Sequence, residues 1–370
     1  MKVFQCIHKY PPHIPVFEKN NNIELRDLSF NELRELLIKD GYASTYILTP
    51  ALEGKHEQVF FTLWDYERLQ HKWAEENGLR TRNLEEIKLA QIEAFKPDVF
   101  YNHSPRYDNH FIEKLKNKKG LRKVCWDAII TNYPWLHENY DLRVTLFEPF
   151  VKYWKQKGLN ASLLRPAVSS TWGQFNSSDR EIDVLFYGQF SDFFFSARNQ
   201  IIIKLLEWQK NNNYDVRVHL QRYSKKLPLF NVRVIRRFTK WVDKTPKQIK
   251  KFSLPPLYGT DLYQAIGNSK IVINSFTNFN GLFKDNMRNY EATGLGALMI
   301  SEDGIYPDFL EPGHDFLTYR DAKELIEKIE YALSLPDHGR EMAIRAQKKL
   351  VNTCTKEKQW KQFCELVEKL

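Results

Sequence analysis

The sequence predicts an α/β protein made of two domains, each built on a doubly wound parallel sheet. Short apolar runs alternate with helical stretches along the chain, and the same alternation starts again in the second half. Strands that are covered by helices on both faces of a sheet have this appearance. The length of 370 residues is enough for two domains that each bury a core.

The first half alternates from its first residues onward. Val3–Ile7 is a short apolar run that predicts a buried strand, and a loop rich in His and Pro follows it. Apolar residues then recur at helical spacing from Phe30 to Leu37 before Gly41, and Ala43–Leu48 predicts the second strand. The later expected elements are a helical stretch at 65–94, broken near residue 78, and strands at 98–102, 123–130, 143–147 and 161–164.

A linker is expected near Pro166, where a polar segment rich in Ser, Thr and Asn runs on to Arg180. We therefore divide the chain into domains at 1–166 and 167–355, followed by a last helix at 356–370. The elements expected in the second half are strands at 182–187, 215–220, 270–274, 297–301 and 317–319, and helices at 196–210, 322–335 and 338–351.

Composition limits the partners and the compartment. The formal charge of +9 and the pI near 9.1 favour anionic partners, which include nucleotides, acidic glycans, anionic lipid and nucleic acid. Four cysteines without C-x-x-C spacing indicate neither a zinc site nor a disulfide framework, so a reducing cytoplasm is expected. No apolar run approaches the roughly 18 residues that span a bilayer. We expect a soluble or peripheral protein without a signal peptide.

The most basic segment is Arg233–Lys251, which holds eight Lys and Arg residues against Asp243, with Phe238 and Trp241 between them. Three interpretations stay open for it. It is a surface that attaches the protein to anionic membrane or glycolipid, a nucleic-acid site, or a solvated face.

The segment Lys284–Asp303 carries the strongest functional signal. A polar turn leads to a short helix that opens near Asn286, and an apolar strand follows. The N-terminus of a helix suits a phosphate, because its free N–H groups and its dipole favour negative charge. Arg288 and Glu291 stand three residues apart and share a helix face, so a cation for a diphosphate would lie beside a carboxylate for ribose hydroxyls. The alternative is an ordinary surface salt bridge.

The run MRNYEATGLGALMISED resembles the R-x-x-E-x-x-x-x-G segment of the group 1 glycosyltransferases, especially their spore-maturation CgeB-like branch. The runs DVLFYGQF, NSKIVINSF and EPGHDFLTY extend the similarity over the second domain. The resemblance implies the GT-B fold, in which two Rossmann-like domains face a cleft and the C-terminal helix returns to the first domain. It also implies that Glu291 binds the ribose of the nucleotide-sugar donor and that Arg288 lies near its diphosphate. The further candidates for donor binding, from their positions or charge, are Asn286, Gly188, Asn274, Ser275, Lys284 and Arg222.

The first domain matches this superfamily only in strand placement and in the run PDVFYNHSP, which resembles a strand-plus-His element near the donor sugar. His103 would then be a catalytic residue. His8 and His13 follow the first strand, where inverting members can place a general base, and Asp127 could orient such a base. Each of these four residues also has an ordinary structural interpretation, as a loop residue or a strand-end cap.

One position departs from the pattern of retaining enzymes. These often carry a second glutamate eight residues before the ribose-binding one, where this chain has Phe283. The stereochemical outcome therefore stays open.

The sequence thus predicts a nucleotide-sugar-dependent glycosyltransferase that acts on a glycan, glycolipid or protein acceptor. No D-x-D segment is available to hold a divalent ion on a diphosphate, so no metal or other cofactor is expected. Two other classes are considered. A nucleotide-sugar epimerase of the same double-Rossmann plan would act without an acceptor. A basic nucleic-acid-binding protein is disfavoured, because no RNP, zinc-finger or helix-turn-helix signature accompanies the charge, so no nucleic-acid partner is expected.

Overall fold

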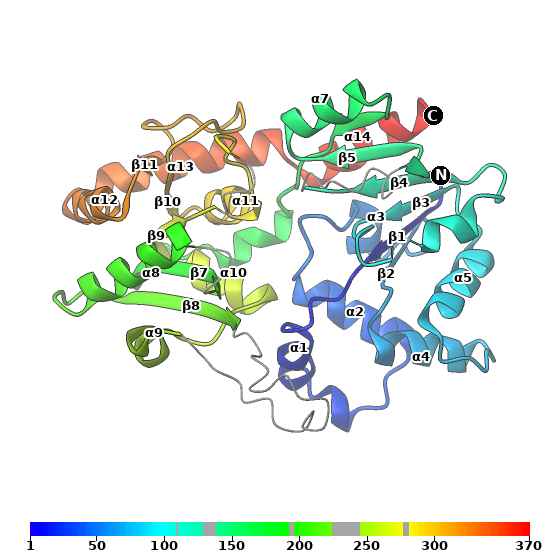
Figure 1. The fold of residues 1–370 in the computed structure, drawn as a ribbon. Helices are drawn as coiled ribbons and strands as arrows, with labels where there is room; N and C mark the ends of the chain where they lie inside the picture. Colours follow the sequence, from blue (N-terminus) through cyan, green and yellow to red (C-terminus); the bar gives the residue numbers. More distant parts are fainter. Residues whose placement is uncertain (109, 129–137, 192–195, 224–244, 277–280) are drawn as a thin grey trace, which may run out of the picture. The chain divides into compact units, whose positions relative to one another are not determined.

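The structure, a computed structural model, describes the chain except residues 109, 129–137, 192–195, 224–244 and 277–280. The chain divides into two compact units. The first unit comprises Met1–Ser170, Tyr258–Thr260 and Thr353–Leu370, and the second comprises Thr171–Leu257 and Asp261–Asn352. Each unit holds one parallel sheet with flanking helices, so the predicted α/β class with two sheets is confirmed (Figure 1).

The first unit has a six-stranded sheet in the order β2-β1-β3-β4-β5-β6. Every adjacent pair is parallel, so the carboxyl ends of all six strands lie at one edge. The strands are β1 (Val3–Ile7), β2 (Val59–Leu63), β3 (Val99–Asn102), β4 (Arg122–Trp126), β5 (Leu142–Thr145) and β6 (Ala161–Leu163). The helices are α1 (Ile14–Asn20), η1 (Ile23–Leu25), α2 (Phe30–Asp40), α3 (Thr49–Leu52), α4 (Glu67–Glu76), α5 (Leu84–Phe95), η2 (Phe111–Leu115) and α7 (Glu148–Gln156).

Helix α2 shows why the predicted boundaries hold. Ser29 caps its first turn by accepting a hydrogen bond from the Glu32 N–H, and the Glu32 side chain accepts one from the Ser29 N–H. Gly41 ends the helix with a φ of 80°, a left-handed conformation that favours glycine. The buried face carries Leu33 and Leu37, as the apolar spacing predicts.

The predicted strand at Ala43–Leu48 is wrong. This segment is a chain of turns, and the second strand of the unit is Val59–Leu63. Buried polar side chains satisfy the backbone of the segment in place of a strand ladder: Gln5, Lys356 and Gln359 donate to its carbonyl oxygens at 2.9, 2.9 and 3.0 Å. Periodicity could not reveal these partners, because two of them lie more than 300 residues away in the sequence.

The C-terminal helix α14 (Lys356–Glu368) belongs to the first unit, as expected for this fold. Thr355 caps its start, and Phe363 and Val367 lie in the core of the unit. The rings of Phe363 and Tyr101 are 4.9 Å apart, so the helix, drawn in red in Figure 1, packs against β3.

The second unit has a five-stranded parallel sheet in the order β11-β10-β9-β7-β8. Its strands are β7 (Ile182–Ser191), β8 (Val216–Tyr223), β9 (Ser269–Asn274), β10 (Leu298–Glu302) and β11 (Leu317–Tyr319). The helices of this part of the chain are η3 (Ser170–Phe175), α8 (Ser196–Gln209), α9 (Lys247–Phe252), α10 (Gly259–Gly267), α11 (Met287–Gly294), α12 (Ala322–Ser334) and α13 (Pro336–Thr353). Its core joins the strands to α8 and α12, with Leu205 and Ile329 in one buried cluster.

Two predictions concern membranes. None of the helices in the described segments combines the length and the hydrophobicity that crossing a bilayer requires. In the basic segment Arg233–Lys251, residues 233–244 lie outside the described part of the chain, so its role stays a prediction.

Candidate active site

Glu291 lies on the second turn of α11, at the carboxyl edge of the second sheet. The hydroxyl of Tyr187, on β7, donates a hydrogen bond to Glu291 Oε2 at 2.6 Å. Oε1 has no hydrogen-bond partner within the described segments. Burial raises the pKa of Glu291, while the Tyr187 hydrogen bond and the nearby Arg288 lower it. The carboxylate is therefore held by one neutral donor, and one oxygen remains for a ligand.

Arg288 links the ends of two adjacent strands. Its Nη2 donates to the Tyr187 carbonyl oxygen at 2.5 Å, and its Nη1 donates to the Ser275 carbonyl oxygen at 3.2 Å. Both partners are neutral, and no carboxylate of the described residues lies within ion-pair distance of Arg288. The surface salt bridge with Glu291 is therefore not formed, and the positive charge of Arg288 is not neutralised by an acidic side chain.

A second arginine meets the same carbonyl group. Arg198, in the first turn of α8, is 6% exposed, and its Nη2 donates to the Ser275 carbonyl oxygen at 2.8 Å. Burial, followed by repulsion from Arg288, lowers the pKa of Arg198 to about 9. Glu302 opposes this shift in pKa. The two guanidinium groups concentrate positive charge at one backbone oxygen, and a bound anion would be stabilised there.

Gly188 lies against Arg288. A Cβ atom at this position would come within 2.6 Å of Arg288 Nη2. Only glycine therefore allows the guanidinium group to lie where it does. The sequence predicted that the strand ends at residue 187, but β7 continues to Ser191 and Gly188 lies within it. Its role is to let backbone and cation approach closely.

Asparagine side chains fix the start of α11. The Asn286 side chain caps the helix by accepting from the Asn289 N–H. Asn274 and Asn286 exchange two amide hydrogen bonds at 2.9 and 3.2 Å, and Asn274 also donates to Asn289 Oδ1 at 2.9 Å. These contacts tie the end of β9 to the helix that carries Arg288 and Glu291.

The remaining predicted donor residues differ in their surroundings. Lys284 Nζ lies 3.0 Å from Glu302 Oε2, so its charge is neutralised. The Ser275 hydroxyl donates to Glu302 Oε1 at 2.6 Å. Both Lys284 and Glu302 line a pocket of about 390 Å³ at the carboxyl edge of the sheet. Arg222 is exposed near the end of β8, and its side chain contacts none of the other donor residues named above.

At the carboxyl edge of the first sheet, His8 follows β1 and Asp65 follows β2. His8 Nδ1 lies 2.7 Å from Asp65 Oδ2, close enough for an ion pair, although its angles fall short of a hydrogen bond. The imidazole stacks on Tyr107 with ring centres 3.7 Å apart. The His8 N–H donates to the Ser104 hydroxyl at 3.1 Å. Nε2 has no hydrogen-bond partner within the described segments, so it could accept a proton.

His103, just after the adjacent strand β3, is buried. Its ring stacks on Trp126 at 4.4 Å and lies 4.3 Å from the ring of Tyr46, while Nε2 has no hydrogen-bond partner. Burial, reinforced by the nearby Lys356, lowers the pKa of His103 to about 3. This imidazole is therefore neutral at physiological pH, so it can form hydrogen bonds but does not serve as a general acid or base.

His13 and Asp127 already have charged partners. The His13 side chain is 2% exposed, and its Nε2 lies 2.9 Å from Asp40 Oδ2. Asp127, after β4, accepts two hydrogen bonds of 2.9 Å from Arg106 Nη2. These contacts give both residues a structural role in the unit, and their predicted catalytic role stays a prediction.

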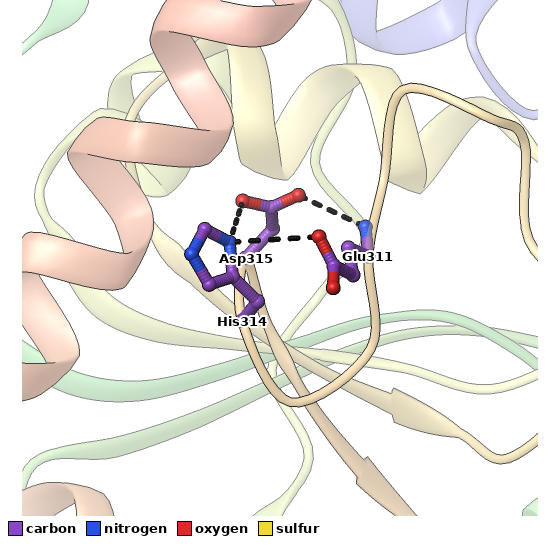
Figure 2. A group of neighbouring side chains, drawn as sticks. All are labelled: Glu311, His314 and Asp315. Carbon is purple, nitrogen blue, oxygen red and sulfur yellow. Dashed lines mark hydrogen bonds and ion pairs between the residues drawn. The ribbon is translucent and has the colours of Figure 1, made fainter.

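The loop before β11 carries a cluster with the side-chain types of a metal site, formed by Glu311, His314 and Asp315 (Figure 2). Its carboxylates are already neutralised by cations. Lys349 Nζ lies 2.7 Å from Asp315 Oδ2, and Arg345 Nε lies 3.7 Å from Asp315 Oδ1. The cluster is an ion-pair network that ties the loop before β11 to α13.

Comparisons with known proteins can now be set beside this geometry. Residues 200–365 match a family model described as glycosyl transferase-like. The structure of Anabaena Alr3699/HepE in complex with UDP-glucose is similar over 100% of both chains, with a TM-score of 0.63 and 11% identity. The fold is GT-B. A glycosyltransferase from Rickettsia africae is similar over 100% of this chain and 98% of its own, with a TM-score of 0.57 and 10% identity.

TarM shares the GT-B fold over 78% of this chain and 59% of its own, with a TM-score of 0.53 and 14% identity. No curated protein matches the sequence significantly. Residues 200–365 thus resemble a glycosyltransferase-like domain, and the GT-B fold prediction is confirmed. Sequence reasoning missed Asp65, which could have been found only from the pairing of β1 with β2.

Proposed function

We propose that this GT-B protein is a glycosyltransferase that moves a sugar from a nucleotide-sugar donor to a glycan, glycolipid or protein acceptor. One observation carries the proposal: Arg198 and Arg288 converge on the Ser275 carbonyl group on the same sheet edge as Glu291. An anion site beside a partly satisfied carboxylate matches a nucleoside diphosphate, which has phosphates next to a ribose with two hydroxyl groups.

Each of these groups has its own role in donor binding. The two arginines hold the diphosphate and stabilise the charge that develops on it as the bond to the sugar breaks. Gly188 leaves room for this close approach. Glu291 accepts hydrogen bonds from the ribose hydroxyls through Oε1, while Tyr187 holds Oε2. The HepE structures contain UDP and UDP-glucose, so we infer a UDP-sugar as the first donor to test.

The first unit supplies groups for the acceptor and the sugar. His8 is the general base in this proposal: Nε2 takes the proton of the acceptor hydroxyl as its oxygen attacks the anomeric carbon, and the sugar–phosphate bond breaks on the opposite side. Asp65 stabilises the imidazolium that forms. His103, which stays neutral, donates a hydrogen bond to a sugar hydroxyl or to the departing phosphate. Phe283 in place of a second glutamate is consistent with this inverting route.

We also propose that transfer needs no metal, because two arginines supply the positive charge that a divalent ion would bring. Activity that EDTA abolishes and magnesium or manganese restores would refute this part. Membership of the spore-maturation branch rests on the Lys284–Asp303 run. A cytoplasmic location rests on the four cysteines, and attachment to the inner face of the membrane rests on Arg233–Lys251.

The function is tested with a panel of nucleotide sugars, each incubated alone and with pooled glycan, glycolipid and peptide acceptors. The proposal predicts acceptor-dependent release of nucleoside diphosphate and a new glycoside, both visible by NMR. A change of sugar configuration in the donor alone would instead identify an epimerase. Binding of arbitrary oligonucleotides without any nucleotide-sugar turnover would favour the nucleic-acid class.

A further inference from the structure

A groove with excess positive charge runs along helix α4 in the first unit. It has a volume of about 560 Å³ and is lined by α4, the turn around η1 and the segment between α4 and α5. Two carboxylates, Asp27 and Glu75, face five cationic side chains, which are Arg26, Arg68, Lys72, Arg80 and Arg82. We propose that this groove binds an acidic stretch of the acceptor glycan, an inference that rests on the proposed glycosyltransferase function.

Part of the positive charge is already neutralised within the protein. Lys72 Nζ lies 3.0 Å from Asp27, and Arg68 Nε lies 3.3 Å from Glu18. The other three arginines, Arg26, Arg80 and Arg82, are exposed and have no ion-pair partner among the described residues. The groove therefore keeps three guanidinium groups for an external anion.

The segment that carries Arg80 and Arg82 is held in place. The Thr81 hydroxyl donates to Glu86 Oε2 at 2.6 Å, which fixes the segment to the start of α5. His71 Nε2 lies 3.3 Å from the Arg82 carbonyl oxygen and ties it to α4. Because the backbone under both arginines is already ordered, binding an anion costs mainly side-chain entropy.

The hydrogen-bonding geometry of arginine and the other side chains of the groove favour an acidic glycan over other anions. A guanidinium group binds carboxylate or sulfate through two parallel hydrogen bonds, which suits a chain with such groups at intervals. No exposed aromatic side chain lines the groove, although single-stranded nucleic acid normally stacks on such residues. Leu25, which is 87% exposed beside the lining residue Arg26, offers little apolar area for a bilayer.

The groove also has a direction that fits acceptor binding. Arg68 lies in the first turn of α4, three residues after Asp65, the partner of His8. The ten residues of α4 span about 15 Å, and Arg80 and Arg82 lie beyond its other end. A chain held along α4 would thus lead to the carboxyl edge of the first sheet, where the proposed base lies.

The test measures binding of three labelled probes by fluorescence anisotropy: an oligogalacturonate, a heparin-derived oligosaccharide and a neutral malto-oligosaccharide. We expect wild-type protein to bind the two acidic probes, more weakly at high salt, and not the neutral one. The double variant Arg80→Ala/Arg82→Ala should lose about 10-fold in affinity. The control Lys152→Ala/Lys155→Ala removes the same charge from exposed positions on α7 and should bind as wild type does.

Four outcomes would overturn the groove proposal. The first is that neither acidic probe binds, and the second is that the neutral probe binds as tightly as the acidic ones. The third is that the double variant and the control lose the same affinity for the acidic probes. The fourth is that oligonucleotides or phosphatidylglycerol vesicles bind more tightly than the acidic probes and depend on Arg80 and Arg82. UDP binding is measured on the same proteins. If UDP still binds when one of these outcomes is found, only the groove proposal is contradicted. If the acidic probes bind but UDP does not, only the proposed function is contradicted.

Discussion

The hydroxyl group of Tyr187 donates a hydrogen bond of 2.6 Å to Glu291 Oε2, across two elements that are 104 residues apart in the sequence. This bond opposes the effect of burial, which raises the pKa of Glu291. Burial likewise raises the pKa of Tyr187, which therefore stays a neutral donor. The ionisation of the Glu291 carboxylate, the proposed ribose ligand, thus depends on a residue of β7.

Tyr187→Phe should shift the pH dependence of nucleotide binding. Without the hydroxyl the pKa of Glu291 rises further, so the carboxylate becomes protonated, and affinity falls, at a higher pH than in the wild type. A group whose pKa is raised by folding contributes stability that is lost as the pH rises through that pKa. Because the variant raises the pKa of Glu291 further, its free energy of unfolding should be lower than that of the wild type mainly at neutral and alkaline pH. Calorimetric titrations of UDP between pH 5 and 8 check this, and superimposable affinity–pH curves would contradict it.

Gly188→Ala should weaken nucleotide binding and also strain the backbone, because Gly188 has a φ of 159°, which L residues rarely adopt. The added Cβ would displace Arg288 Nη2, which lies at the end of a flexible side chain and can move at little cost. Loss of one charge-assisted contact to the diphosphate predicts about 10-fold weaker binding of UDP, and the backbone strain predicts a melting temperature below that of the wild type. Gly173→Ala, with no atom near the added Cβ, is the control. Equal UDP affinity in both variants would show that Arg288 does not meet the diphosphate.

His8→Ala should lower kcat by about 100-fold or more, because the acceptor hydroxyl loses its base. Asp65→Asn should also lower kcat, since the imidazolium that forms on His8 loses its carboxylate. UDP affinity should not change in either variant. A His8→Ala enzyme with normal turnover, or a His13→Ala enzyme that is inactive in its place, would move the base elsewhere.

His103→Ala should lower kcat by about 10- to 1,000-fold and leave UDP binding nearly intact, as expected for a hydrogen bond that matters as the sugar–phosphate bond breaks. The shape of the pH–rate profile should not change, because the pKa of His103 is already about 3. A lost pH limb in the variant would mean that His103 carries the catalytic proton.

Sequence patterns predicted most of the fold, because caps and apolar spacing act locally. Ser29 and Gly41 mark both ends of α2, and Asn286 marks the start of α11. The error at Ala43–Leu48 arose because distant side chains satisfy a buried turn whose composition resembles a strand.

The candidate site was only partly predictable. Arg288 and Glu291 are three residues apart on one helix, so their spacing is visible in the sequence. The contacts of Tyr187 with Glu291, and of Asp65 with His8, depend on which strands are neighbours in the sheets. Arg198 has no local signal, because its role comes from the end of β9 that it meets.

The most direct test of the central claim is calorimetric titration of UDP into the wild type, Glu291→Ala and the control Glu327→Gln, whose side chain is exposed on α12. We predict that UDP binds the wild type and the control equally. Glu291→Ala should lose about 1.5 to 3 kcal/mol of binding free energy while remaining folded, because a charge-assisted hydrogen bond to ribose is gone. Unchanged UDP affinity in folded Glu291→Ala would contradict the assignment of this edge of the second sheet as the nucleotide site.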